Sequence, residues 1–488
     1  MVTLVGGSDS TDGAVSLREI DTACTTPGHT AADRVDLYWS GVRSAGTGQV
    51  AMSWTSRTSL ARYRSSGILH ARSLRLGDQA EALDKVLARP TRLAALGAIH
   101  LWRTVTAEQV AAIVGEALLA STRSVDLRLL LAAGLAQRGV VFAGDRRAAV
   151  PPLWRPDLSA RELRFEDRLS YAEWLGVYAG QEWSFGPQAG WHNLLATELS
   201  LRVAELTPIG TVFGELLAAE RLLFPGRPES ERSRRSADAV WVRDDGLRIL
   251  VEVTANANAA VRTRIDHWIR ALLTDTEASS IVVFVDVSDP DGKSRPDHLL
   301  RRALADAVTS TPERMDARIA ERICFARYRD WFPDRGLVHP SFLGLRVERP
   351  TGRPGARWET VDLLDPYAVP FSPADQEAAR APIVHAGDLF GVPHWLRGSG
   401  VDLDAVVRRL AGFPPPAPMS PERRAELAGR FAGRAFADDE RADSQPVAQD
   451  GHGDHEAPDP AEYLPAGPRR PRPLPLASRD LGNERGGA

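Results

Sequence analysis

The stretch Ser280–Val287, SIVVFVDV, constrains the fold more than any other part of this chain. Its apolar residues run consecutively instead of alternating, which is typical of a strand with both faces buried. Such a strand lies inside a sheet that helices cover on both sides. Amphipathic helices are predicted before and after it, at 261–273 and 296–322. The sequence therefore predicts an α/β fold, α+β overall, with a mixed sheet.

Two further strands, AVWVR and RILVEV, are predicted before this stretch. They are joined by residues 244–246, DDG, which is a strong signal for a tight turn. Helices are predicted before them, at WHNLLATELSLRVAEL and at 212–224, VFGELLAAERLLF. CFARYRDWF adds a last strand, and GLRVERP with RWETVDLL form a predicted hairpin further on. These elements place most of the mixed sheet between residues 191 and 335.

The remaining regions differ in composition and periodicity. The chain becomes rich in Pro and Gly after about residue 335, and its last part is poor in large apolar residues. We predict a loose N-terminal arm at 1–55, a winged helix-turn-helix at 56–150, a connector at 151–190, the mixed-sheet domain at 191–335, a C-terminal extension with the hairpin and short helices at 336–437, and a disordered tail at 438–488.

Three short helices followed by a hairpin are predicted between residues 87 and 150. Thr106 is a good N-cap for the second helix, and Glu108 and Gln109 follow inside its first turn. This order is typical of a winged helix-turn-helix, whose third helix enters the major groove of DNA. The same pattern also serves protein–protein contacts, so both uses stay open. If the partner is DNA, we expect it to be contacted by Arg123, Ser124 and Arg128 on the third helix and by Arg146 and Arg147 at the wing tip.

The charge balance excludes a general attraction to nucleic acid. The chain has 60 Lys and Arg against 64 Asp and Glu, a net charge of −4, so any DNA contact must come from local patches. The segment 57–103 is rich in arginine and is either a solvated surface or a face that contacts phosphates. Lysine occurs only at Lys85 and Lys293, which leaves little choice for a catalytic lysine. Abundant arginine and alanine indicate a high-GC genome, such as that of an actinobacterium.

Other features point to a cytoplasmic location. Cys24 and Cys324 have no metal-ligand spacing, which favours a reducing compartment. The N-terminus shows no signal peptide, and no stretch is apolar enough for a membrane helix. We therefore expect a cytoplasmic protein without a membrane partner.

Asp238 and Glu252 are the candidate catalytic residues. They lie on the two strands joined by the DDG turn, Asp238 at the start of one and Glu252 inside the other. Hydrolysis of a phosphodiester by a divalent metal needs two or three carboxylates that converge on one point. We expect Asp238 and Glu252 to hold Mg²⁺, with Glu220 or Glu198 adding a ligand through water. The alternative is a pair of acids at the edge of a sheet that face water.

Residues 236–238, SAD, followed by 252–254, EVT, resemble the core of the PD-(D/E)xK nucleases. The resemblance implies that Mg²⁺ binds the two acids and that a basic residue two positions past the second acid steadies the reaction. Here Thr254 occupies that position, and Ala237 stands where proline is usual. Arg262 or Arg264, on the following helix, is expected to supply the missing charge. An arginine cannot act as a base at neutral pH, so cutting and binding without cutting both stay open.

The wider arrangement, from about Leu87 to Asp286, resembles the replication-relaxation family of actinobacterial plasmids and mobile elements. The matching features are the winged helix, a helix that opens with His192-Asn193 and carries Glu198, then Ala219-Glu220-Arg221, the acid-bearing hairpin, and a basic helix with Arg264, His267 and Trp268. The resemblance implies a DNA-binding winged helix joined to a nuclease-like domain, associated with plasmid replication or DNA relaxation.

These observations lead to two hypotheses about function. In the first, the chain docks on double-stranded DNA through the winged helix and either nicks it with Mg²⁺ or binds it without cutting. In the second, it is a non-catalytic regulator or adaptor whose second domain mediates dimerisation or binds a partner. A second copy of the chain and replication or conjugation proteins are the expected protein partners.

Overall fold

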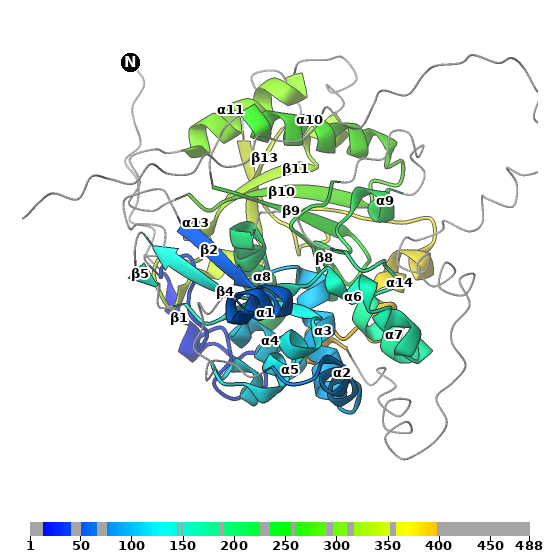
Figure 1. The fold of residues 1–488 in the computed structure, drawn as a ribbon. Coiled ribbons are helices and arrows are strands. Elements are labelled where there is room, and N and C mark those ends of the chain that lie inside the picture. Colours follow the sequence, from blue (N-terminus) through cyan, green and yellow to red (C-terminus); the bar gives the residue numbers. More distant parts are fainter. Residues whose placement is uncertain are drawn as a thin grey trace, which may run out of the picture. The chain divides into compact units, whose positions relative to one another are not determined.

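The structure is a computed structural model that describes most of the first 397 residues (Figure 1). The described residues are 13–40, 50–65, 76–143, 146–147, 150–184, 190–224, 235–255, 259–288, 296–309, 317–351 and 358–397. The helices predicted within 401–437 and the tail predicted at 438–488 lie outside them. None of the helices in the described ranges has the length and apolarity to cross a membrane.

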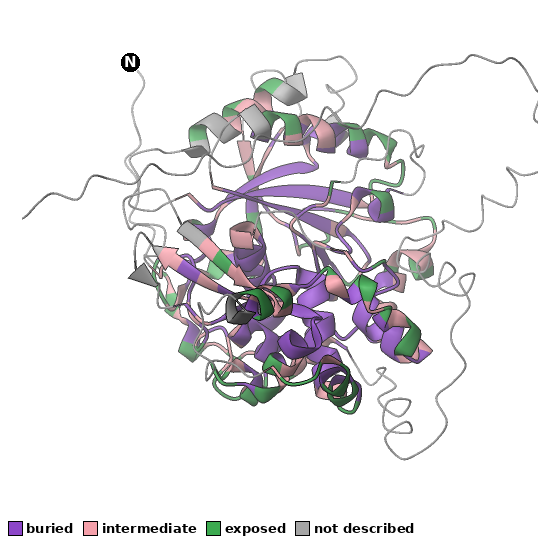
Figure 2. Cartoon of the chain, in the orientation of Figure 1, coloured by how far each residue is buried: buried purple, intermediate pink, exposed green. Residues whose placement is uncertain are grey.

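The largest sheet has seven strands in the order β14-β13-β11-β10-β9-β8-β7. The strands are β7 (Thr211–Gly214), β8 (Ala239–Val242), β9 (Arg248–Thr254), β10 (Ser280–Asp286), β11 (Ile323–Arg327), β13 (Arg346–Pro350) and β14 (Trp358–Asp362). β10 pairs in parallel with β9 and β11, and the other neighbours pair antiparallel, so the predicted mixed sheet is confirmed. Every residue of β10 is buried, as its unbroken apolar sequence predicts (Figure 2).

Helices cover both faces of this sheet. α10 (Ala259–Thr274) and α11 (Pro296–Thr309) lie along one face, and α8 (Gly190–Leu206) lies on the other (Figure 1). α10 packs through one apolar stripe at helical spacing, while its other side is exposed (Figure 2). The stripe consists of Val261, Ile265, Trp268, Ile269 and Leu272.

The turn between β8 and β9 is where the DDG signal places it. The N–H of Arg243 donates to the carbonyl of Leu247 at 2.9 Å, which closes the hairpin. Gly246 has a φ of +94°, a conformation that favours glycine. A side chain at Gly246 would also collide with the backbone of Ala379. The residue types of this turn therefore fix the register of the two strands that carry Asp238 and Glu252.

The helix predicted at 212–224 is wrong. Its first part is the strand β7, and only Glu220–Leu223 form a short helix, α9. Val212 and Phe213 favour a strand, and β8 offers them a partner edge. Gly214 ends the strand against the ring of Trp102, where no larger residue fits. Tertiary pairing thus outweighs the helical spacing of the leucines that follow.

A second sheet lies among the elements between residues 50 and 156. Its strands are β2 (Val50–Thr55), β3 (Val105–Thr106), β4 (Ala136–Ala143) and β6 (Leu153–Pro156), in the order β2-β4-β6-β3, and β5 (Arg146–Arg147) pairs with β4. Its helices are α1 (Arg57–Ser65), α2 (Gln79–Leu87), α3 (Pro90–Trp102), α4 (Ala107–Val114) and α5 (Val125–Ala133). Thr106 and Gln109 form a capping box at the start of α4, which confirms the predicted helix start.

Two predicted boundaries cut through sheets. β6 lies past residue 150 but is an inner strand of the second sheet, and β13 and β14 lie past residue 335 but extend the first. The two halves also pack on each other, since α3 contacts β7 and α4 contacts α8. The described residues accordingly belong to one compact unit, Met1–Glu440.

Residues 13–40 are not the loose arm that their composition predicts. β1 (Val15–Ser16) pairs with β12 (Leu337–Val338), and η1 (Leu17–Glu19) follows it. Leu17, Cys24, Ala31, Leu37 and Tyr38 are buried. Long-range contacts of this kind hold the segment and leave no local periodicity that a sequence pattern would reveal.

The remaining helical elements are short and lie at several places along the chain, including the connector and the C-terminal extension. They are η2 (Ala117–Ala120), α6 (Ser159–Glu162), η3 (Phe165–Arg168), α7 (Tyr171–Tyr178), α12 (Ala317–Ala320), α13 (Tyr328–Trp331), η6 (Pro340–Phe342), α14 (Gln376–Ala386) and η7 (His394–Leu396). The connector aromatics Phe165, Trp174 and Trp183 are buried, so they serve packing rather than base stacking.

Candidate acidic site

Asp238 immediately precedes β8 and Glu252 lies in β9, and Asp238 forms hydrogen bonds with the β9 residues on both sides of Glu252. The backbone N–H of Asp238 donates to the carbonyl of Val251 at 2.9 Å. Its Oδ2 accepts from the N–H of Val253 at 2.7 Å. The hairpin therefore brings the two acids together, as the turn between their strands predicts.

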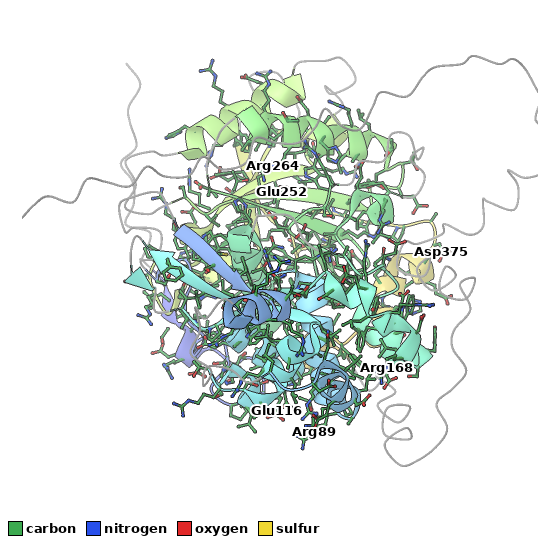
Figure 3. The ribbon with its side chains drawn as sticks, in the orientation of Figure 1. Arg89, Glu116, Arg168, Glu252, Arg264 and Asp375 are labelled. Atoms are coloured by element: carbon green, nitrogen blue, oxygen red, sulfur yellow. The ribbon has the colours of Figure 1, made fainter. Side chains whose placement is uncertain are left out.

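Glu252 points toward α10. Its Oε1 accepts from Trp268 Nε1 at 2.7 Å, and its Oε2 accepts from Arg264 Nη1 at 3.2 Å. The two donors are four residues apart and so share one face of α10. Figure 3 shows Arg264 directly above Glu252 in this view. With only 4% of the residue exposed, both carboxylate oxygens of Glu252 face donors from the protein.

Both acids have pKa values raised to about 7. For Glu252 the largest cause is burial, and the nearby charge of Asp238 adds to it, while Arg264 and Trp268 lower the pKa only in part. For Asp238 burial is again the largest cause; the N–H of Val253 lowers its pKa and the charge of Glu215 raises it. One guanidinium beside two buried acids therefore leaves the pKa values of both acids well above their ordinary values.

Glu215 is part of this site, although no sequence motif singles it out. Gly214 of β7 pairs with Ala239 of β8, so the next residues along, Glu215 and Asp238, come opposite each other. Asn193 of α8 donates to the Glu215 carboxylate. A strand assignment for Thr211–Gly214 would have revealed this third acid, and the predicted helix concealed it.

Thr254, at the position of the expected lysine, is 1% exposed. It lies on the same face of β9 as Glu252, because side chains alternate along a strand. Its Oγ1 has no hydrogen-bond partner among the described residues. A threonine hydroxyl carries no charge, so this position adds no cation to the acidic pair.

The two other glutamates considered as metal ligands have different partners. Glu220 is fully buried and lies 3.0 Å from Nε2 of His267 on α10. Glu198 lies in a separate network with Arg34 and Arg202. The described ranges hold no group of three or more His, Cys, Asp and Glu side chains that could hold a metal ion.

The donor set therefore does not fit the predicted Mg²⁺. Mg²⁺ requires oxygens that are open to it in near-octahedral geometry. Here the oxygens of Glu252 accept from Arg264 and Trp268, and one oxygen of Asp238 accepts from the backbone. The guanidinium of Arg264 lies against the carboxylate of Glu252.

The residues predicted to contact DNA are only partly exposed. Arg123 and Arg128 are exposed, but Ser124 is buried, because its hydroxyl caps α5 by accepting from the N–H of Leu127. The prediction that Ser124 is exposed is thus wrong. Arg146 and Arg147 form β5, and their side chains lie outside what the structure describes, as does the turn at 144–145.

Comparisons with protein-family models, with curated proteins and with solved structures found no match.

Proposed function

We propose that this chain is a duplex-DNA-binding protein of the replication-relaxation type. In this proposal a winged helix, formed by α3, β3, α4, α5, β4 and β6, docks on the DNA. The seven-stranded sheet and its helices form a core of the PD-(D/E)xK type that binds DNA without cutting it.

The observation that carries the proposal is the order and pairing of the elements between residues 90 and 156. Helix, short strand, two helices and a hairpin follow one another, and β6 pairs with both β3 and β4, which closes a small sheet beside the helices. This order fits a winged helix-turn-helix with α5 as the recognition helix. Arg123 and Arg128 are exposed there, where they are available to a phosphate or a base edge.

The acidic core supports the second part of the proposal. α8, the antiparallel strands β7, β8 and β9, then α10 and the parallel strand β10 follow one another, with Asp238 and Glu252 side by side. This agrees with a nuclease-like core. The 3.2 Å contact from Arg264 to Glu252 places a cation of the protein itself against the acids. The arginine offsets part of their charge but offers no bound water for attack on a phosphodiester.

Salt dependence of duplex binding by the full chain tests this proposal. The apparent affinity for a labelled duplex is measured over a series of salt concentrations. We expect it to fall linearly on a log–log plot, because bound phosphates release counterions. Arg123→Ala and Arg128→Ala should each reduce the slope by about 0.9 for every phosphate that the variant no longer neutralises. Arg302→Ala, an exposed residue on α11 across the large sheet, is the matched control.

Two outcomes contradict the proposal. One is a duplex affinity that does not weaken with salt. The other is a pair of variants, Arg123→Ala and Arg128→Ala, whose slopes equal that of Arg302→Ala. Either result favours the alternative that the chain is an adaptor with a protein partner.

A further inference from the structure

The outward side of α5 carries an exposed aliphatic residue. Val125, the first residue of the helix, is 64% exposed, although Leu127, Leu130 and Leu131 of the same helix are buried. Arg128 lies one turn further along and is also exposed. Residues three apart are neighbours on a helix surface, so Val125 and Arg128 form one stripe.

The charges around this stripe favour a polyanion as its occupant. Arg123 precedes Val125 and Arg128 follows it, and both are exposed. Asp126, the acid within the helix, is held by Arg92 at 2.6 Å. The side chain of Glu116 caps η2 by accepting from the N–H of Leu118. On α2, which packs against α5, Glu81 pairs with Lys85 and Asp84 pairs with Arg168. An apolar residue between two exposed cations suits the major groove, where methyl groups and acceptor atoms alternate along the base edges.

We propose that Val125 and Arg128 read the base sequence of the DNA. Val125 contacts the methyl group of a thymine, and Arg128 donates to the O6 and N7 acceptors of a guanine. Three residues of helix rise about 4.5 Å, close to the roughly 3.4 Å between stacked base pairs, so the two bases belong to neighbouring pairs. This inference rests on the proposed function and adds to it a base preference at two positions.

Selection followed by removal of a single methyl group tests the inference. The full chain selects duplexes from a pool with a random core, and each thymine of the selected site is then replaced by uracil. Uracil lacks only the methyl group. We expect one position at which uracil weakens binding by about fourfold, the effect of exposing one methylene-sized group that is otherwise buried. A guanine should be selected in a neighbouring base pair.

Variants connect the effect to the two residues. In Val125→Ala the difference between thymine and uracil should vanish, and the helix should be retained because alanine is the better helix former. In Arg128→Ala the preference for guanine should relax. Val384→Ala on α14 is the matched control, because Val384 is 72% exposed, and it should discriminate as the unaltered chain does.

The outcomes separate this inference from the proposed function. If duplex binding depends on salt but no thymine is sensitive to uracil, or if the sensitivity persists in Val125→Ala, the base readout is wrong and the docking proposal stands. If no duplex is retained at low salt, both are wrong. Self-association of the chain that disappears in Val125→Ala would identify the stripe as an interface between copies and would also overturn the readout.

Discussion

Glu198 and Glu252 are both buried glutamates, yet their surroundings give them opposite properties. Glu198 lies against two guanidinium groups, with Arg34 Nη2 and Arg202 Nε each 3.1 Å from its Oε1, and Gln109 donates to its Oε2 at 3.3 Å. Burial raises its pKa, but the two arginines outweigh burial, and the pKa ends below its ordinary value. Glu198 is therefore ionised throughout the physiological range.

Glu252 has one arginine and an acidic neighbour. Its pKa ends well above the ordinary value, because Arg264 does not offset both burial and the charge of Asp238. The difference between the two glutamates shows that the number of cations around a buried acid decides its role. A fully paired acid holds structure together, whereas an under-paired acid can change its charge near neutral pH and is typical of functional sites.

The network around Glu198 also explains why residues 13–40 are fixed in place. Arg34 pairs with Glu205 as well as Glu198, and Arg202 reaches Asp36 at 2.9 Å. The side chains of Arg34 and Arg202 are each only 1% exposed, so neither charge has water as a partner. These ion pairs join the N-terminal segment to α8.

Breaking the ion pairs of Arg34 with Glu198 and Glu205 should have the largest effect on the free energy of unfolding. Arg34→Leu leaves Glu205 and Glu198 buried with one arginine fewer, and we expect it to destabilise the chain by about 3–5 kcal/mol. The midpoint and slope of urea unfolding measure this change. Arg346→Leu removes an arginine from a half-exposed pair with Asp362 and should cost about 1 kcal/mol or less. Equal losses in the two variants would contradict the structural role of Arg34.

Removing the charge of Glu252 should change how the stability of the chain depends on pH. A carboxyl with a raised pKa in the folded state stabilises the fold at low pH, and this contribution is lost as pH rises from about 4.5 to about 7. Glu252→Gln cannot ionise. It should therefore gain stability relative to the unaltered chain between pH 5 and pH 8, on the order of 2 kcal/mol. Urea unfolding at both pH values measures the gain.

If the free energies of unfolding of the unaltered chain and of Glu252→Gln differ by the same amount at pH 5 and at pH 8, Glu252 does not titrate in this range. Glu198→Gln provides the opposite expectation. Because the pKa of Glu198 is lowered, its ionised form is the stabilising one above its unfolded pKa. That variant should lose stability at pH 8 instead of gaining it.

Removing the guanidinium from the under-paired site should open it to a metal ion. Arg264→Ala frees Oε2 of Glu252 beside Asp238, and a bound metal ion would favour the ionised form of both acids. We expect Mn²⁺ to bind this variant at least tenfold more tightly than the unaltered chain, about 1.4 kcal/mol. Electron paramagnetic resonance of free Mn²⁺ measures the binding. The double variant Arg264→Ala with Glu252→Gln should lose the gain, and equal binding of Mn²⁺ by all three proteins would contradict the expectation that Arg264 keeps a metal ion from Glu252.

Features that depend on neighbours in the sequence could be predicted. The DDG turn, the buried strand β10 and the capped start of α4 each follow from a few adjacent residues. Because the turn sets the register, the meeting of Asp238 and Glu252 could also be predicted, together with the approach of Arg264 from the next helix.

Features that depend on distant partners could not be predicted. Arg34 and Glu198 are 164 residues apart, and nothing in either local sequence pairs them. The position of Glu215 could not be predicted because the pairing of β7 with β8, which places it, outweighs the helical spacing of the leucines that follow. Ser124 lies between residues that are exposed, but its place at the helix start makes its hydroxyl a cap that accepts from the N–H of Leu127.

Incubation of the full chain with supercoiled plasmid in Mg²⁺ or Mn²⁺, beside the Glu252→Ala variant, tests the central claim most directly. The claim is that Arg264, and not a metal ion, accompanies the acidic pair while the winged helix holds the duplex. The expected result is that both proteins slow the plasmid in a gel and leave it supercoiled. Nicked circles that form with the unaltered chain and are absent with Glu252→Ala would contradict it.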